Sequence, residues 1–159
     1  CIAITLLLEF PNSFAYMLDV SSEALNYARK NLEQYKLSGR SRIITDINEI
    51  DSELELVVSN PPYIPSGEIN SLMKTVRDYE PLIALDGGND GMKYYREIFA
   101  QCESITKHDG YIILEAGDLN QVQALKNLSH DFMFDREFLD SNNFPRALVF
   151  QFQFRRSDD

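Results

Sequence analysis

The residues best suited to chemistry form one short run, Ser59-Asn60-Pro61-Pro62-Tyr63. An apolar segment, residues 54–58, comes directly before it and is typical of a short buried strand. The two prolines supply backbone carbonyls but no N–H donors, and Asn60 adds a side-chain carbonyl. Because a residue that precedes proline is restricted to extended geometry, the run is a stiff group of hydrogen-bond acceptors beside an aromatic ring.

Such a group of acceptors suits a planar NH2 group that donates two hydrogen bonds and stacks on a ring. This describes a primary amide or the exocyclic amine of a base. Its nitrogen lone pair is delocalised, so Asn60 and the Pro61 carbonyl would assist mainly by aiming the nitrogen at an electrophile. The alternative interpretation is an ordinary proline-rich turn in which Tyr63 packs locally.

A second segment makes the pattern more specific. Residues 76–91 read Val-Arg-Asp-Tyr-Glu-Pro-Leu-Ile-Ala-Leu-Asp-Gly-Gly-Asn-Asp-Gly. Together with the Asn-Pro-Pro-Tyr run, this segment resembles the HemK-type release-factor glutamine N5-methyltransferases, and the resemblance extends from Cys1 to about Phe152. It implies an enzyme that transfers a methyl group from S-adenosylmethionine to the side-chain amide nitrogen of a glutamine. The implied protein partner is a peptide chain release factor, modified in its Gly-Gly-Gln loop, so the implied process is translation termination.

The resemblance also implies roles for particular residues. The expected catalytic residues, which also bind the substrate, are Asn60, Pro61, Pro62 and Tyr63, and Asn60 is expected to contact the cofactor as well. Glu80 and Pro81 lie in a segment that resembles family loops that close over the substrate, and they are expected to bind it. No general base is apparent, and the proton can leave the nitrogen after the transfer.

Two acidic residues that end predicted strands are the other expected contacts to the cofactor. The resemblance implies that Asp19 accepts hydrogen bonds from the ribose hydroxyls. It also implies that Asp46 accepts one from the adenine amino group, with Ile47 packing on the ring. The alternatives are local: Asp19 as part of a helix cap, a role better suited to Ser21 or Ser22, and Asp46 as the start of an Asx turn.

Composition bounds the class of protein. The 159 residues are enough for one domain with a sizeable core, and 44% hydrophobic and 25% charged residues are ordinary for a globular protein. Two cysteines and two histidines are too few for a disulfide framework or a zinc site, which favours a reducing cytoplasm and no metal. No apolar run is long enough for a membrane span. The net charge of −10 argues against nucleic acid as the only docking surface.

Hydrophobic periodicity predicts alternating strands and helices, hence a three-layer α/β fold with a mostly parallel sheet. The resemblance adds a class I methyltransferase (Rossmann-like) topology with an antiparallel last strand, and a helix over residues 1–8. The family's first strand and glycine-rich cofactor loop would precede Cys1, so residues 1–159 are expected to be a catalytic domain truncated at its N-terminus. Predicted strands cover 14–20, 42–45, 54–58, 111–115, 132–139 and 146–154; further predicted helices cover 22–37, 69–76, 92–106 and 119–128.

Two other functions stay open at this point. One is an N-methyltransferase that acts on an exocyclic amine of a nucleic-acid base, since such enzymes can share Asn-Pro-Pro-Tyr. The acidic charge and the Glu80-Pro81 segment weigh against it. The other is an inactive binding module without a cofactor site, and the absent glycine loop is its only support.

Overall fold

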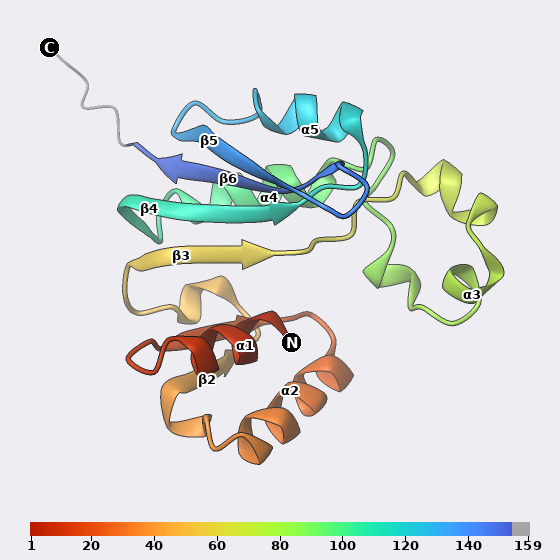
Figure 1. Cartoon of the computed structure of the whole chain (residues 1–159). Helices are drawn as coiled ribbons and strands as arrows, with labels where there is room; N and C mark the ends of the chain where they lie inside the picture. Colours follow the sequence, from red (N-terminus) through yellow and green to blue (C-terminus); the bar gives the residue numbers. More distant parts are fainter. Residues whose placement is uncertain (154–159) are drawn as a thin grey trace, which may run out of the picture. The chain divides into compact units, whose positions relative to one another are not determined.

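The computed structural model describes residues 1–153, which form two compact units, one from Cys1 to Ser52 and the other from Glu53 onward (Figure 1). The first unit contains a two-stranded sheet in which the strands run parallel, with Leu18 opposite Ile44. Its elements in chain order are helix α1 (Ile2–Glu9), strand β1 (Ala15–Leu18), helix α2 (Ser22–Gln34) and strand β2 (Ser41–Ile44), with single 3-10 turns at Ser38–Arg40 and Ile47–Glu49.

The first unit has its own small core. Alternate residues of the strands face the helices, because successive side chains on a strand point to opposite faces. Arg40 donates to three backbone carbonyls in the last turn of α1 and in the loop that follows it, at Leu7 (2.7 Å), Phe10 (3.2 Å) and Ser13 (3.2 Å). The packed residues are Ile4, Leu7, Leu32 and Leu37 with Ala15, Met17 and Ile43.

The second unit is a four-stranded mixed sheet in the order β3-β4-β6-β5. Strand β3 pairs parallel with β4, whereas β6 pairs antiparallel with both of its neighbours. The antiparallel last strand is therefore as predicted. The strands are β3 (Leu54–Ser59), β4 (Thr106–Glu115), β5 (Phe132–Leu139) and β6 (Pro145–Phe152); the helices are α3 (Lys74–Arg77), α4 (Lys93–Cys102) and α5 (Leu119–Leu125), with 3-10 turns at Ser66–Ser71 and Leu82–Ala84.

The core of the second unit lies where α4 and α5 pack on this sheet. Ile112 and Leu114 of β4 are opposite Phe150 and Leu148 of β6, so these four buried side chains share one face. From α4, the ring of Phe99 meets that of Phe150 edge-on at 5.1 Å between centroids. Helix α5 contributes Val122 and Leu125 to the same cluster. None of the helices among residues 1–153 is long and apolar enough to cross a bilayer.

Several predicted boundaries are wrong, each for a tertiary or backbone reason. The helix predicted over 92–106 ends at Cys102, and β4 begins at Thr106 instead of Tyr111. Thr106 pairs with Leu54, and the register then shifts before Leu56 pairs with Tyr111. Pairing with β3 therefore draws this segment into the sheet against its local pattern.

The remaining differences are smaller. Helix α2 stops at Gln34, before its predicted end at Leu37, because Lys36 takes a left-handed backbone conformation with φ 57°. The helix predicted over 69–76 is replaced by one 3-10 turn and the short α3, and α5 ends at Leu125 instead of Leu128. Strand β6 lies inside the sheet, between β4 and β5. The predicted last residue of that strand, Phe154, lies outside the described residues.

Candidate functional site

The Asn-Pro-Pro-Tyr run leaves β3 at its carboxyl end. Because β3 and β4 are parallel and Ser59 is opposite Leu114, residues 60–63 and the segment after Glu115 emerge at the same edge of the sheet. Asn60 is exposed and Pro61 is buried. Within residues 1–153, no protein group hydrogen-bonds the side chain of Asn60 or the carbonyl oxygen of Pro61. The exposed side chain of Asn60 is therefore open to a ligand that brings N–H donors, and the Pro61 carbonyl has no donor among the described residues.

The second segment of the resemblance lies beside the first. The Ile64 amide donates to the Leu85 carbonyl at 3.0 Å, and the Gly87 amide donates to the Ile64 carbonyl at 2.8 Å. Ser66 continues this pairing, because its amide donates to the Gly88 carbonyl at 2.9 Å. The segment that carries Glu80 and Pro81, both exposed, is thus attached to the loop that follows β3.

Tyr63 is held by its hydroxyl as well as by packing. It is half-buried, and its hydroxyl donates to Glu115 Oε1 at 3.3 Å. Burial and the nearby Glu115 carboxylate raise the pKa of the Tyr63 phenol, so the hydroxyl stays protonated and can donate. Tyr63 therefore packs locally, as the alternative interpretation of the motif predicts, and Glu115 holds its hydroxyl. A contact between the Tyr63 ring and a substrate stays a prediction.

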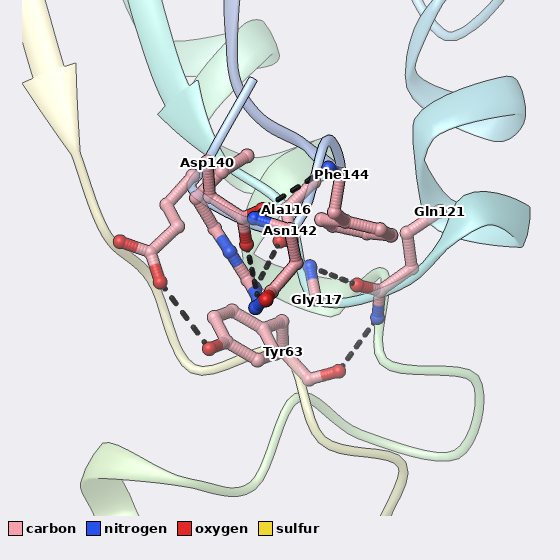
Figure 2. Close-up of polar contacts among 9 residues, drawn as sticks. Tyr63, Ala116, Gly117, Gln121, Asp140, Asn142 and Phe144 are labelled. Carbon is pink, nitrogen blue, oxygen red and sulfur yellow. Dashed lines mark hydrogen bonds and ion pairs between the residues drawn. The ribbon is translucent and has the colours of Figure 1, made fainter. Parts of the chain in front are cut away.

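Figure 2 shows the polar contacts that surround Tyr63. The side-chain amide of Gln121 donates to the Tyr63 carbonyl at 2.6 Å and accepts from the Gly117 amide at 2.9 Å. Arg146 donates to the Ala116 carbonyl at 2.8 Å and pairs with Asp140 at 3.7 Å. Gln121 and Arg146 were not predicted from the sequence, because a glutamine in a helix and an arginine in a strand carry no local signal of such contacts.

Three glycines allow the chain to approach Tyr63 closely. A Cβ at Gly87 would lie 2.8 Å from the Tyr63 Cα, and one at Gly117 would lie 2.5 Å from the Tyr63 ring. A Cβ at Gly91, where φ is +70°, would overlap the Tyr63 carbonyl oxygen. Gly87 and Gly91 therefore have a structural role that was not predicted from the sequence. Because they have no side chain, they leave space for the backbone of the Asn-Pro-Pro-Tyr loop.

The residues predicted to bind the cofactor's nucleoside lie in the first unit, after β1 and β2. One Asp19 oxygen accepts from the Ser21 amide at 2.8 Å, and the other has no donor among the described residues. Ser21 caps α2 by accepting from Ala24, as the sequence predicts. Asp46 accepts from the Asn48 amide at 2.8 Å, which is the Asx turn considered as its alternative role.

The turn at Asp46 is stabilised by Glu49, a residue that was not predicted from the sequence to have a role. The Glu49 carboxylate accepts from the Thr45 amide at 2.8 Å, the Asp46 amide at 3.0 Å and the Thr45 hydroxyl at 3.2 Å. These donors hold the pKa of Glu49 below its usual value. Asp46 and the half-buried Ile47 thus sit on an ordered turn, and the exposed carboxylates of Asp19 and Asp46 suit hydroxyl and amine donors.

One pocket opens beside the Glu80-Pro81 segment. Its volume is about 400 Å³, and it is lined by Leu82, Ile83, Asp86, Gly88, Lys93 and Tyr94. Leu82 and Ile83 are 59% and 55% exposed, so the pocket has an apolar rim on the side of the segment expected to bind substrate. Among residues 1–153, no group of three or more His, Cys, Asp or Glu side chains is placed to hold a metal ion.

The sequence of the chain is similar to those of known methyltransferases. Residues 1–79 match the family model described as the methyltransferase small domain. The chain is 40% identical over 118 residues to the release factor glutamine methyltransferase of Bradyrhizobium diazoefficiens, covering 73% of this chain and 40% of that protein. It is 32% identical over 155 residues to the release factor glutamine methyltransferase of Chlorobaculum tepidum, covering 93% and 52%. The predicted resemblance is confirmed by these similarities.

Solved structures show the same fold. A methyltransferase from Pyrococcus furiosus superposes with a TM-score of 0.67 over 96% of this chain and 69% of that one, at 15% sequence identity. Likeness at this identity shows the fold alone, which is the class I methyltransferase fold, as predicted. The chain spans about half or less of the length of the two curated relatives named above.

Proposed function

Taking as premise that the chain has the class I methyltransferase fold and resembles the release factor glutamine methyltransferases, we propose that it supplies the catalytic part of such an enzyme. The reaction is transfer of a methyl group from S-adenosylmethionine to the side-chain nitrogen of a glutamine. The proposed substrate is the Gly-Gly-Gln loop of a peptide chain release factor, modified in the cytoplasm. The net charge of −10 supports a protein substrate over a nucleic acid bound directly by this chain.

The observation that carries the proposal is the contrast within the loop after β3. Tyr63 and Ile64 are tied by hydrogen bonds to Gln121, Leu85 and Gly87. The Asn60 side chain and the Pro61 carbonyl, a few residues upstream, have no protein donor within residues 1–153. A rigid loop that keeps two acceptors free is suited to hold both N–H bonds of a primary amide.

This geometry explains how a poor nucleophile would react. With both of its N–H bonds held, the glutamine nitrogen has its face directed at the methyl carbon, and most of the gain comes from orientation. The new N–C bond forms as the S–C bond breaks, and one amide proton then leaves to water. Bound S-adenosylmethionine supplies the electrophilic methyl group on a sulfonium sulfur.

We assign the nucleoside of the cofactor to the first unit. Asp19 follows β1 directly and keeps one carboxylate oxygen free of donors among the described residues, which suits the ribose hydroxyls. Asp46 and Ile47 sit on the turn after β2 that Glu49 orders, which suits the adenine amino group and ring. Glu80 and Pro81 would contact the protein substrate from the segment attached at Ile64.

The direct test offers labelled S-adenosylmethionine to the intact natural protein with a release factor, the same factor with alanine at the acceptor glutamine, and nucleic acid. We expect label only in the first. The matched variant is Asn60→Ala, for which we expect turnover lower by a factor on the order of a hundred with cofactor binding retained.

The control for this variant is Asn127→Ala, which removes an exposed asparagine of the same unit whose side chain donates only to the Gln123 carbonyl. It should leave turnover unchanged. Label in nucleic acid but not in the release factor would overturn the proposed substrate. A wild-type rate for Asn60→Ala would overturn the role of Asn60.

A further inference from the structure

Gln121 is buried, at 4% exposure, and both the oxygen and the nitrogen of its side-chain amide form hydrogen bonds. Its oxygen accepts from the Gly117 amide at 2.9 Å. Its nitrogen donates to the carbonyls of Tyr63 at 2.6 Å and Gly91 at 3.4 Å. The opposite orientation of the amide would place its oxygen against two carbonyl oxygens, so these contacts fix one orientation.

These three contacts belong to three separate segments of the second unit. Tyr63 follows β3, Gly91 precedes α4, and Gly117 follows β4. Figure 2 shows the Gln121 amide lying between the backbone of Gly117 and the Tyr63 carbonyl. One side chain therefore ties together, by hydrogen bonds to backbone only, the segments that meet at the carboxyl edge of the sheet.

The hydrogen bond from Gln121 to the Tyr63 carbonyl acts on the loop that carries the two acceptors, the Asn60 side chain and the Pro61 carbonyl. It fixes the peptide plane between Tyr63 and Ile64, and the N–H of the same plane donates to the Leu85 carbonyl. Four torsions separate this plane from the plane of the Pro61 carbonyl, and the ring of Pro62 fixes one of them, its φ. Holding the Tyr63 carbonyl therefore limits the directions in which the Pro61 carbonyl, two residues upstream, can point.

We propose that Gln121 is a positioning residue for methyl transfer, since its amide holds the Asn60–Tyr63 loop with the two acceptors aimed at the substrate nitrogen. The inference rests on the proposed function, because it assigns a task to the same loop. Gln121 acts through Tyr63 and does not touch the substrate. Its loss therefore lowers turnover with little effect on the binding of the cofactor.

Three variants of the intact natural protein separate positioning from general stability. Gln121→Met keeps most of the volume and removes every hydrogen bond of the amide. Gln121→Glu keeps the acceptor for Gly117 but places a second oxygen against the carbonyls of Tyr63 and Gly91. The control is Val122→Ala, which removes buried methyl groups from the adjacent position of α5 and destabilises folding but removes none of the hydrogen bonds of Gln121.

We expect Gln121→Met to lower kcat by about tenfold to a hundredfold, as for a displacement of about an ångström at a reacting group, and to leave cofactor affinity within about twofold. Val122→Ala should keep the kcat of the wild type at temperatures where both remain folded. An unchanged kcat for Gln121→Met, or an equal loss for Val122→Ala, would overturn the positioning role.

The pH dependence of kcat in Gln121→Glu distinguishes a positioning role from a purely structural one. Burial and the two facing carbonyls raise the pKa of the introduced carboxyl, and its protonated form has an O–H that can donate to Tyr63. The kcat of this variant relative to wild type should therefore rise as the pH is lowered, while circular dichroism shows both proteins folded throughout. A ratio that does not change with pH would overturn the inference.

A measurement without substrate keeps this inference separate from the proposed function. Hydrogen exchange at the Ile64 and Gly87 amides should accelerate in Gln121→Met and stay slow in Val122→Ala. If the wild type fails to methylate a release factor, this exchange result still tests whether Gln121 holds the loop. Equal exchange in both variants would overturn it whatever the substrate is.

Discussion

Gly117→Ala tests whether the position of Tyr63 matters for turnover. Gly117 follows β4 at the sheet edge, and its backbone does not need a positive φ, so alanine is conformationally allowed there. The added Cβ would lie 2.5 Å from Tyr63 Cδ2, 2.8 Å from Tyr63 Cε2 and 2.9 Å from Gln121 Oε1. The substitution therefore acts through contact with Tyr63 and Gln121.

The size of the effect follows from these distances. Ordinary contact begins at 3.4 Å, so the Tyr63 ring must move by about 0.9 Å. A displacement of this size in a group that positions a reacting atom lowers turnover by a factor on the order of a hundred. Forcing a side chain out of a packed site costs about 1–3 kcal/mol of the free energy of unfolding. Both losses should appear in the same variant.

The assay compares methyl transfer and thermal unfolding in Gly117→Ala and in Gly67→Ala. Gly67 lies in the same unit, and a Cβ there meets nothing within 4 Å, so this control should change stability by less than about 0.5 kcal/mol and leave turnover unchanged. Cofactor binding should be retained in both, because neither substitution lies in the first unit, to which the nucleoside is assigned.

A double-mutant cycle identifies the cause. If the Tyr63 ring receives the clash, most of the stability cost of Gly117→Ala should vanish when it is combined with Tyr63→Ala. Full turnover in Gly117→Ala, or a stability cost that persists without the Tyr63 ring, would refute the reasoning. The first result would mean that the loop tolerates displacement, and the second that the clash lies elsewhere.

Two further predictions concern carboxylates. Asp19→Ala should weaken cofactor binding by roughly 1–3 kcal/mol, because the ribose hydroxyls lose a charged acceptor, and unchanged affinity by calorimetry would assign Asp19 to the turn before α2. The amides of Phe144 and Asn142 hold the pKa of Asp140 below its usual 3.8, so the stability it contributes is present above about pH 4 and is lost as the pH falls through its folded value. Asp140→Asn should therefore be less stable than wild type at neutral pH, with a difference in unfolding free energy that shrinks in acid; a difference independent of pH would contradict this.

The sequence alone predicted most elements of the fold, because their hydrophobic periodicity is local. Strand β5 has the predicted bounds, Phe132–Leu139, and β3 differs from its prediction by one residue. Ser21 was one of two expected caps for α2, and it accepts from Ala24. The position of Asn-Pro-Pro-Tyr at the end of a strand also came from the sequence, as did the resemblance that links it to residues 76–91.

Tertiary pairing decided what local patterns do not contain. Thr106 looks like the end of a helix but pairs with Leu54, so the start of β4 was predicted wrongly. Gln121 contacts Tyr63 across 58 positions of the chain, and a glutamine near the start of a helix looks like any solvated residue. Gly117 is required only because the Tyr63 ring lies against it. Periodicity and motif spacing report on neighbours along the chain, whereas the orientation of this loop depends on groups that become neighbours only when β3 and β4 pair.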